Sequence, residues 1–296
     1  MGFPKIEDLQ AVDTAISMAF HEGQKQRAAD DLNLIATITR STRSKQSYPF
    51  LQSSPQFRKW VGDRVIQGVD DFKKYELVNE DWEVTIGIPV NDIADDEWGV
   101  YVDQAKAIGP AYERYKARLV YKALKNGNAA DALCFDGLPF FSASHPVGDG
   151  TQSNYTSGAN PPWVIIDDTG MKPIVFQERQ DLQLVPKINP SDDNIFFNKM
   201  AIWGANARFS VGYGMWQTAH QSRADLTEDN LNAALLAMQS LTDKNGEVIG
   251  LTPNLLVCGP ALQPKAMKLL SATTMANGAT NVMQGMLKLH VSPFFA

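Results

Sequence analysis

Two stretches in the N-terminal half place apolar residues three or four positions apart, a spacing that predicts amphipathic helices. The first stripe consists of Ile6, Leu9, Val12, Ile16 and Phe20. The second belongs to a long helix from about 101 to 125 and consists of Ile108, Tyr112, Tyr115, Leu119 and Ala123. Gly109-Pro110 lies inside this helix, so we expect a kink or a restart there. Its charged side chains, Lys116 among them, are expected on a face that meets solvent or a neighbouring subunit.

The chain before position 48 is a polar arm around the first helix. A short apolar patch of Leu32, Leu34 and Ile38 follows that helix, and the polar run 41–47 predicts an exposed loop. Such an arm is either a frayed terminus or a strap that lies on a neighbouring subunit, and we favour the strap.

The segment 48–90 has the alternation that is typical of extended chain. A half-buried strand is predicted from the alternating residues Trp82, Val84, Ile86 and Ile88. Its hairpin partner is predicted from Phe72, Tyr75 and Leu77, with a turn at 79–81 and an acidic turn at 92–97. A two-stranded hairpin is marginally stable alone, so it must lie on its own domain or on the next subunit. A hairpin ahead of a long helix therefore indicates assembly rather than catalysis.

The rest of the chain mixes strands and helices. The stretch 134–147 predicts an apolar loop, and 148–162, rich in Gly, Ser and Asn, predicts a flexible excursion. Strands are predicted at 173–176, at 195–216 and at 255–258.

Two helices are predicted in the last third. Thr227 caps the first, whose buried stripe is Leu231, Leu235 and Met238. Asn245-Gly246 predicts a tight turn, and Gly259-Pro260 opens the second helix. The fold class is therefore α+β.

Composition narrows the function. The 296 residues are 44% hydrophobic and 20% charged, as in ordinary globular proteins, and the net charge of −6 argues against a dedicated nucleic-acid binder. No apolar run approaches the length of a membrane span, and no signal peptide is expected from the N-terminal residues. The two cysteines, Cys134 and Cys258, are expected to be buried thiols rather than a disulfide.

Candidate chemistry is sparse. A cysteine hydrolase would pair Cys134 or Cys258 with His145 or His220, but neither cysteine lies in a recognisable signature. The four histidines show no HxxxH and the cysteines no CxxC, so no metal site and no cofactor is predicted. The sequence also lacks the glycine patterns of nucleotide-binding loops.

Several segments, spread over nearly the whole chain in one order, carry a resemblance to a known family. They are FRKWVGDRVIQ (57–67), WEVTIGI (82–88), DDEWGVY (95–101), ALKNG (123–127), CFDGLPFFSASHPV (134–147), KPIVFQER (172–179), WGANARFSVGYGMWQTA (203–219), DLTEDNL (225–231) and MLKLHVSPFF (286–295). In these segments the chain resembles the major head subunits, or major capsid proteins, of Mu-like transposable bacteriophages.

The resemblance implies the tailed-phage major capsid fold of the Hong Kong 97 type. The regions expected are an N-terminal arm (1–45), an extended hairpin loop (46–90), a peripheral domain (91–221) with a spine helix (98–125) and a β-sheet, a mainly axial α/β domain (222–282), and a C-terminal strand (283–296) that returns to the peripheral sheet.

The implied function is structural. Copies would join as hexamers and pentamers into an icosahedral shell around double-stranded DNA, bound without sequence specificity. The other implied partners are portal, scaffold or protease, and decoration proteins, and the implied location is the virion, assembled in the bacterial cytoplasm. Intersubunit contacts are expected at Trp60, Phe72, Tyr75, Trp82, Ile6 and Leu9.

Other functions stay open at this point. The alternatives are a tail-tube or decoration virion protein, against which the long helix weighs, and the cysteine hydrolase. Some members of the wider fold cross-link their subunits through lysine and asparagine. Lys73 and Lys74 lie in the hairpin, where ordinary solvated lysines are the simpler interpretation.

Overall fold

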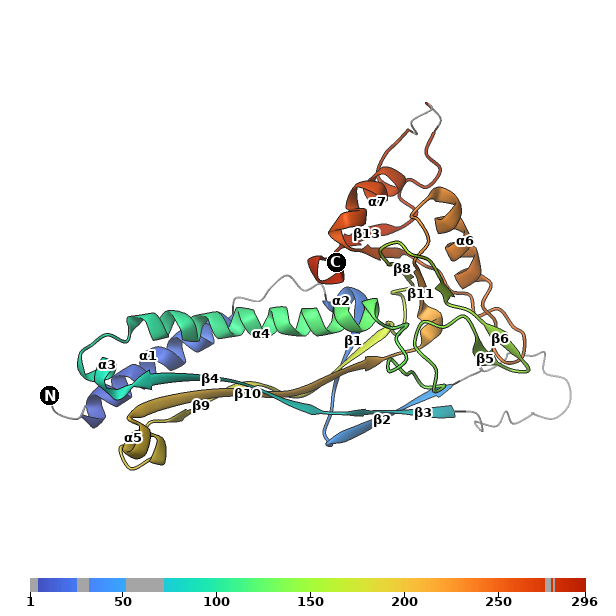
Figure 1. The fold of residues 1–296 in the computed structure, drawn as a ribbon. Helices are drawn as coiled ribbons and strands as arrows, with labels where there is room; N and C mark the ends of the chain where they lie inside the picture. The colour runs from blue at the N-terminus through green and yellow to red at the C-terminus, as the bar shows by residue number, and fades with distance from the viewer. Residues whose placement is uncertain (1–4, 26–31, 52–71, 275–277, 279) are drawn as a thin grey trace, which may run out of the picture.

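The computed structural model describes residues 5–25, 32–51, 72–274, 278 and 280–296. Figure 1 shows two regions set at an angle: a long arm, and an upright lobe at one end of it. We call the first the long arm, which contains α1 (Ile6–Lys25), α4 (Gly99–Lys125) and a four-stranded sheet. We call the second the upright lobe, which contains a five-stranded sheet, α6 (Glu228–Gln239) and α7 (Gln263–Leu270).

The long arm is built on two strands of 14 residues each, β9 (Ile174–Lys187) and β10 (Met200–Tyr213), joined through the short helix α5 (Asp193–Asn198). The sheet order is β1-β9-β10-β4, where β1 is Ala36–Arg40 and β4 is Glu80–Pro89. Strand β4 runs antiparallel to β10, from Met200 opposite Pro89 to Phe209 opposite Glu80. The helix α4 lies along this sheet, after the short helix α3 (Val90–Ala94).

The spine helix is confirmed almost residue for residue, because 98–125 was predicted and α4 spans Gly99–Lys125. It continues through Pro110 without a restart. Helix α1 lies against it at Gly109, where a Cβ would collide with the backbone of Gly23. Lys116, expected on a solvated face, is instead buried. Its Nζ pairs with Glu113 at 2.8 Å and lies 4.6 Å above the ring of Tyr112.

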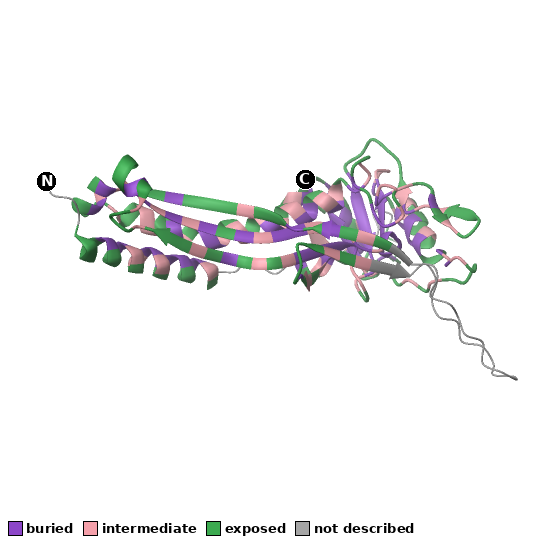
Figure 2. Cartoon of the chain, turned by 90° about the horizontal axis from the view of Figure 1, so that it is seen from below, coloured by how far each residue is buried: buried purple, intermediate pink, exposed green. Residues whose placement is uncertain are grey.

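The upright lobe has a mixed sheet of order β13-β12-β8-β11-β7. These strands are Lys288–Val291, Leu255–Cys258, Trp163–Ile166, Ala219–Ser222 and Tyr155–Thr156. Every residue of β8, β11 and β12 is buried. Figure 2 shows the contrast, with buried residues gathered in the lobe while the strands of the arm alternate buried and exposed positions. The Thr227 cap is confirmed, since its side chain accepts a hydrogen bond from the Asn230 amide at 3.3 Å.

The C-terminal strand differs from expectation. It was predicted to return to the peripheral sheet, but β13 pairs in parallel with β12 in the lobe, with Leu256 opposite Leu289. Two 3₁₀ turns, Pro260–Leu262 and Pro293–Phe295, flank this part of the lobe, and a third, Trp216–Thr218, precedes β11. A short sequence pattern specifies a strand but not its partner, which long-range packing selects.

The predicted hairpin is also paired differently. Strand β3 (Phe72–Val78) pairs with β2 (Lys45–Leu51) and not with β4. The predicted turn at 79–81 is absent because the buried Asn79 holds the chain extended, donating from Nδ2 to the carbonyls of Arg43 at 2.9 Å and Ser44 at 3.2 Å. Strand β4 instead pairs along its edge with β10, and its buried residues are Ile86 and Ile88.

Two further segments are more ordered than predicted. The expected excursion 148–162 contains the strand β6 (Gly150–Gln152), which pairs with β5 (His145–Val147), and also β7. The expected strand 195–216 begins as the helix α5 and becomes a strand only at Met200. A four-residue helix α2 (Leu32–Ile35) leads into β1. None of the helices in the described part of the chain is long and apolar enough to span a membrane.

Candidate assembly surfaces

The predicted contact residues fall into three groups. Trp60 lies outside the described residues, and Phe72 begins β3 but its side chain is outside them as well. Leu9 and Tyr75 are engaged within their own chain. Leu9 is buried on α1, and the Tyr75 hydroxyl accepts a hydrogen bond from the Tyr213 amide at 3.3 Å. Ile6 is 59% exposed at the start of α1. Their contacts with a second subunit stay a prediction.

Trp82 lies half-buried between β10 and α4. Its Nε1 donates to the Phe209 carbonyl at 3.2 Å, and its ring stacks on Phe209 with centroids 5.3 Å apart. The ring of Tyr115 meets it edge-on at 5.1 Å. These contacts hold the indole in one orientation, with part of it facing a groove.

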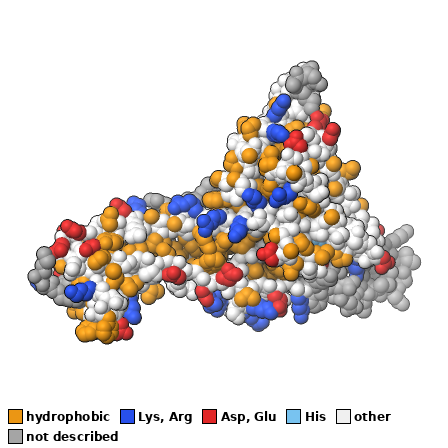
Figure 3. Space-filling view, viewed as in Figure 1, with side chains coloured by type: hydrophobic (Ala, Val, Ile, Leu, Met, Phe, Trp, Pro, Cys, Tyr) orange, Lys and Arg blue, Asp and Glu red, His pale blue; other side chains and the backbone are white. Residues whose placement is uncertain are grey.

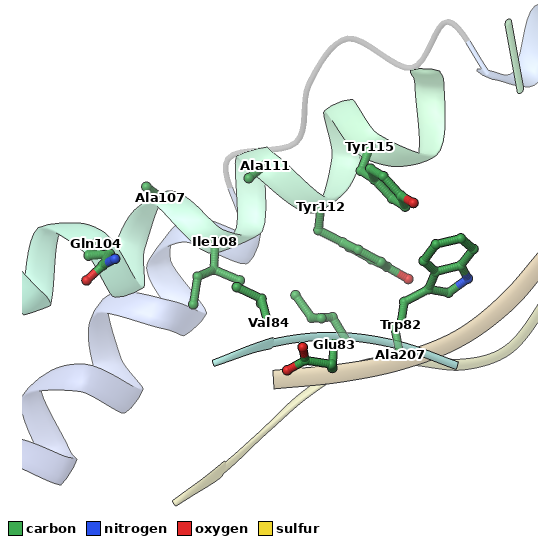
Figure 4. Close-up of a pocket in the computed structure, with 11 residues that line it drawn as sticks. Trp82, Glu83, Val84, Gln104, Ala107, Ile108, Ala111, Tyr112, Tyr115 and Ala207 are labelled. Atoms are coloured by element: carbon green, nitrogen blue, oxygen red, sulfur yellow. The ribbon is translucent and has the colours of Figure 1, made fainter. Parts of the chain in front are cut away.

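We call this groove the spine groove, and Figure 4 shows it between α4 and strand β4. It has a volume of about 470 Å³ and is lined by Trp82, Glu83, Val84, Gln104, Ala107, Ile108, Ala111, Tyr112, Tyr115, Leu182 and Ala207. Most of these side chains are apolar or aromatic. Ala107 and Ala111 line the helical wall of the groove with small side chains. The volume is within the range of pockets that hold apolar groups.

Tyr112 contributes the notable polar atom of the spine groove. Its hydroxyl is buried and has no hydrogen-bond partner among the described residues. Burial raises the pKa of Tyr112, and the nearby carboxylates of Asp181, Glu178 and Glu113 raise it further. The hydroxyl therefore stays protonated at neutral pH, and its oxygen is closed off from the open part of the groove.

The far end of the long arm carries two adjacent exposed aromatics, Phe196 and Phe197, which we call the tip pair. Each is 72% exposed, and their rings meet edge-to-face with centroids 5.0 Å apart. Figure 3 shows an apolar cluster at that end of the molecule. Exposed apolar residues that cluster in this way indicate a contact surface.

The local sequence explains why the tip pair points outward. Ile195 is buried, and Asn194 ties α5 to the sheet by donating to the carbonyls of Lys187 at 3.0 Å and Met200 at 2.6 Å. Lys199 ends the helix with a left-handed φ of 50°. The tip pair was missed in the sequence because 195–216 was interpreted as strand; the Asn189-Pro190 breaker and the helix-starting Asp192 could have revealed it.

A polar cluster in the loop after α4 is the arrangement closest to an active site. The donor atoms of Cys134, Asp136 and His145 lie within 4.8 Å of one another, a proximity that the motif search did not predict. Cys134 Sγ lies 3.1 Å from Asp136 Oδ1, and His145 Nδ1 lies 2.6 Å from Asp136 Oδ2. His145 also stacks on Trp216 with centroids 4.1 Å apart.

The electrostatics of this cluster suit a structural role. Burial raises the pKa of the Cys134 thiol, and the adjacent Asp136 raises it further, whereas a nucleophile needs a lowered pKa. Burial alone would raise the pKa of Asp136, but hydrogen bonds from His145, Cys134 and the Leu138 amide outweigh it and hold the pKa below its usual value. The cluster therefore fastens the loop 134–145.

The other candidate catalytic residues are equally buried. Burial raises the pKa of Cys258 to about 11. Burial lowers the pKa of His220 to about 4, and its Nε2 lies 2.9 Å from the Thr156 hydroxyl. Neither side chain reaches a surface at which a substrate could bind.

Comparisons with known proteins agree across the whole chain. The family model for the Mu-like prophage major head subunit gpT matches residues 9–295. The chain is 32% identical to the major capsid protein of Escherichia phage Mu, over 92% of this chain and 93% of that protein. It is also 32% identical to the Mu-like prophage FluMu major head subunit of Haemophilus influenzae, over 82% of each. Among solved structures, it is similar to a chain of the procapsid of bacteriophage JBD30, with a TM-score of 0.81, 29% identity, and coverage of 98% of this chain and 100% of that one.

Proposed function

The chain belongs to the family of Mu-like major head subunits, and we propose that its copies join as hexamers and pentamers through the long arm and the β2–β3 hairpin. It is a structural protein, the major capsid subunit of a Mu-like phage, with the Hong Kong 97 type of fold. The cysteine hydrolase and the tail-tube or decoration alternatives are not favoured, since the relatives are capsid proteins.

The observation that carries this proposal is the isolation of the β2–β3 hairpin. Among the described residues, the two strands pair only with each other, while their base is fastened to the arm. The Tyr48 hydroxyl donates to Gln177 Oε1 at 2.8 Å, and Tyr75 meets the Tyr213 amide. A two-stranded ribbon needs support beyond itself, and an adjacent copy of the chain supplies it.

The domains and partners extend the same proposal. We assign the long arm as the peripheral domain and the upright lobe as the axial domain, whose sheet includes β7, β8, β11 and the C-terminal strand β13. The shell would assemble in the bacterial cytoplasm, with a portal, a scaffold or protease, and decoration proteins as further partners.

Packaged double-stranded DNA is the remaining partner that we propose, without sequence-specific contacts. Three exposed cations support it, because Arg114, Arg118 and Lys122 are four residues apart and so share one face of α4. Figure 3 shows Lys and Arg side chains gathered along the arm near the lobe. A row of this kind suits phosphate contacts despite the negative net charge.

The test of the proposal is expression of the chain with its phage's scaffold protein, followed by negative-stain microscopy. Closed shells, or rings of six and five subunits, are the expected particles. Monomers under every condition tried would overturn the assembly role.

A further inference from the structure

No part of the chain that the structure describes covers the tip pair. Phe196 and Phe197 are fastened on a short helix whose buried side is already occupied by Asn194 and Ile195. Both rings therefore remain in solvent in the isolated chain. Two adjacent aromatics in this position are the residues that dominate protein interfaces once they are buried.

The spine groove has the chemistry to cover them. It is apolar, it is walled by the aromatic rings of Trp82, Tyr112 and Tyr115, and its volume of about 470 Å³ admits aromatic side chains. Aromatic rings prefer edge-to-face and offset-stacked neighbours, which these three side chains offer. A backbone carbonyl of the incoming segment would meet the Tyr112 hydroxyl only if the side chain turns, because its oxygen is closed off in the single chain.

The tip pair cannot enter the groove of its own chain. The groove lies beside Ala207, seven residues along β10 from Met200, where the strand leaves α5. At 3.3 Å per residue this separation is ~23 Å along a continuous strand. Because β10 is paired on both sides, it cannot fold back to bring the tip to its own groove. A tip pair that occupies this groove must therefore belong to another chain.

Charge favours a second copy as that chain. Lys199 is exposed two residues after Phe197, and Glu83 is exposed in the lining of the groove; Asp193 is exposed at the other end of α5. A tip that enters the groove of another copy with Lys199 toward Glu83 would bring these two opposite charges together. Each copy carries both surfaces, so one contact between different patches can repeat from copy to copy, as closed assemblies require.

We propose that the tip pair of one subunit docks in the spine groove of an adjacent subunit in the shell. The inference rests on the proposed assembly but adds its own claim, namely which two surfaces meet. It also accounts for two features that the single chain leaves unexplained: an exposed pair of phenylalanines and an apolar groove with an unsatisfied hydroxyl.

Cysteine cross-linking in assembled shells tests this contact. The double variant Phe197→Cys with Ala111→Cys changes two exposed positions, one in each surface, and the native Cys134 and Cys258 are buried at 5% and 0% exposure. Shells treated with a short bismaleimide are expected to give a ladder of covalent oligomers on a denaturing gel. The matched control, Leu236→Cys with Ala111→Cys, uses a 68% exposed residue of the lobe and should stay monomeric.

Three other outcomes would overturn the inference. Normal shells without a ladder would mean that the two surfaces do not meet, although assembly itself stands. Cross-linking of Phe197→Cys alone would mean that tips meet tips. Cross-linking of the control to the same extent would mean that the groove accepts any nearby segment. Failure of the unaltered chain to form shells would instead count against the proposed function.

Discussion

The upright lobe and the long arm complete their cores in different ways. In the lobe, β8, β11 and β12 are buried at every position, so the core closes within one chain. In the arm, only two of the ten residues of β4 are buried, and the distal half of β9 alternates or is exposed. The lobe therefore buries its central strands completely, and its core is continuous with that of the arm, while the arm leaves more of its strand surface exposed.

The largest expected effect is on assembly, from shortening the hairpin. Replacing residues 50–73 by Asn-Gly would join Pro49 to Lys74, which are opposite each other, and keep the anchored Tyr48 and Tyr75. We expect shells to be lost in negative stain, with the unfolding transition of the lobe unchanged. Shells that still form would mean that the hairpin is dispensable.

The second effect is a loss of stability caused by a substitution in the core of the upright lobe. Trp163 is fully buried on β8, and its Nε1 donates to the Ala224 carbonyl at 2.9 Å. Trp163→Ala should lower the free energy of unfolding by about 3–5 kcal/mol, measured by urea denaturation of the unassembled chain. The control Leu236→Ala, at a 68% exposed site, should change it by less than about 0.5 kcal/mol.

A third effect separates α1 from α4. A Cβ on Gly23 would collide with the Lys106 carbonyl, so Gly23→Ala should cost about 3 kcal/mol or detach α1. Limited proteolysis of α1 would report detachment. Gly99→Ala is the matched control, because nothing lies within 4 Å of the added Cβ. Equal behaviour of the two variants would contradict the close packing of the helices.

A fourth effect is the pH dependence of the lobe. Burial lowers the pKa of His220 to about 4, whereas an unfolded histidine titrates near 6.5. Between these values the unfolded chain binds more protons than the folded one, so stability falls as the pH falls from 6.5 to 4. The loss is on the order of 3 kcal/mol, measured by urea denaturation across this range.

Two variants test whether His220 causes this dependence of stability on pH. His220→Gln should flatten the dependence on pH, while His21→Gln, at an exposed site on α1, should leave it as it is. If the stability of His220→Gln still falls as the pH falls from 6.5 to 4, another group causes the dependence.

The smallest effect concerns DNA. Neutralising Arg114, Arg118 and Lys122 to glutamine should reduce the slope of log affinity against log salt by about 2–3 for a random duplex. A triple change at Lys5, Lys187 and Lys288, which are exposed on other elements, serves as the control and should alter the slope less. If both triple variants reduce the salt slope equally, Arg114, Arg118 and Lys122 have no special role in binding DNA.

Much of the fold could be predicted from local patterns. The long helix, the buried strand 255–258, the Thr227 cap and the strand at 82–88 are all present where they were expected, although Val84, expected on the buried face, is 41% exposed. Each depends on residues close in sequence, because helical and strand periodicity and capping act over a few positions. The family resemblance also followed from segments that could be read directly along the chain.

Strand partners and assembly surfaces were decided only by the tertiary structure. Strand β4 pairs with β10, about 120 residues away, and β13 joins β12 in the lobe. The Cys134–Asp136–His145 cluster and the spine groove exist because loops and helices distant in sequence meet. The sequence by itself determined most of the helices and strands, though not α5, and the family to which the chain belongs. Burial and long-range pairing determined which of their faces remain open, because these depend on the whole chain at once.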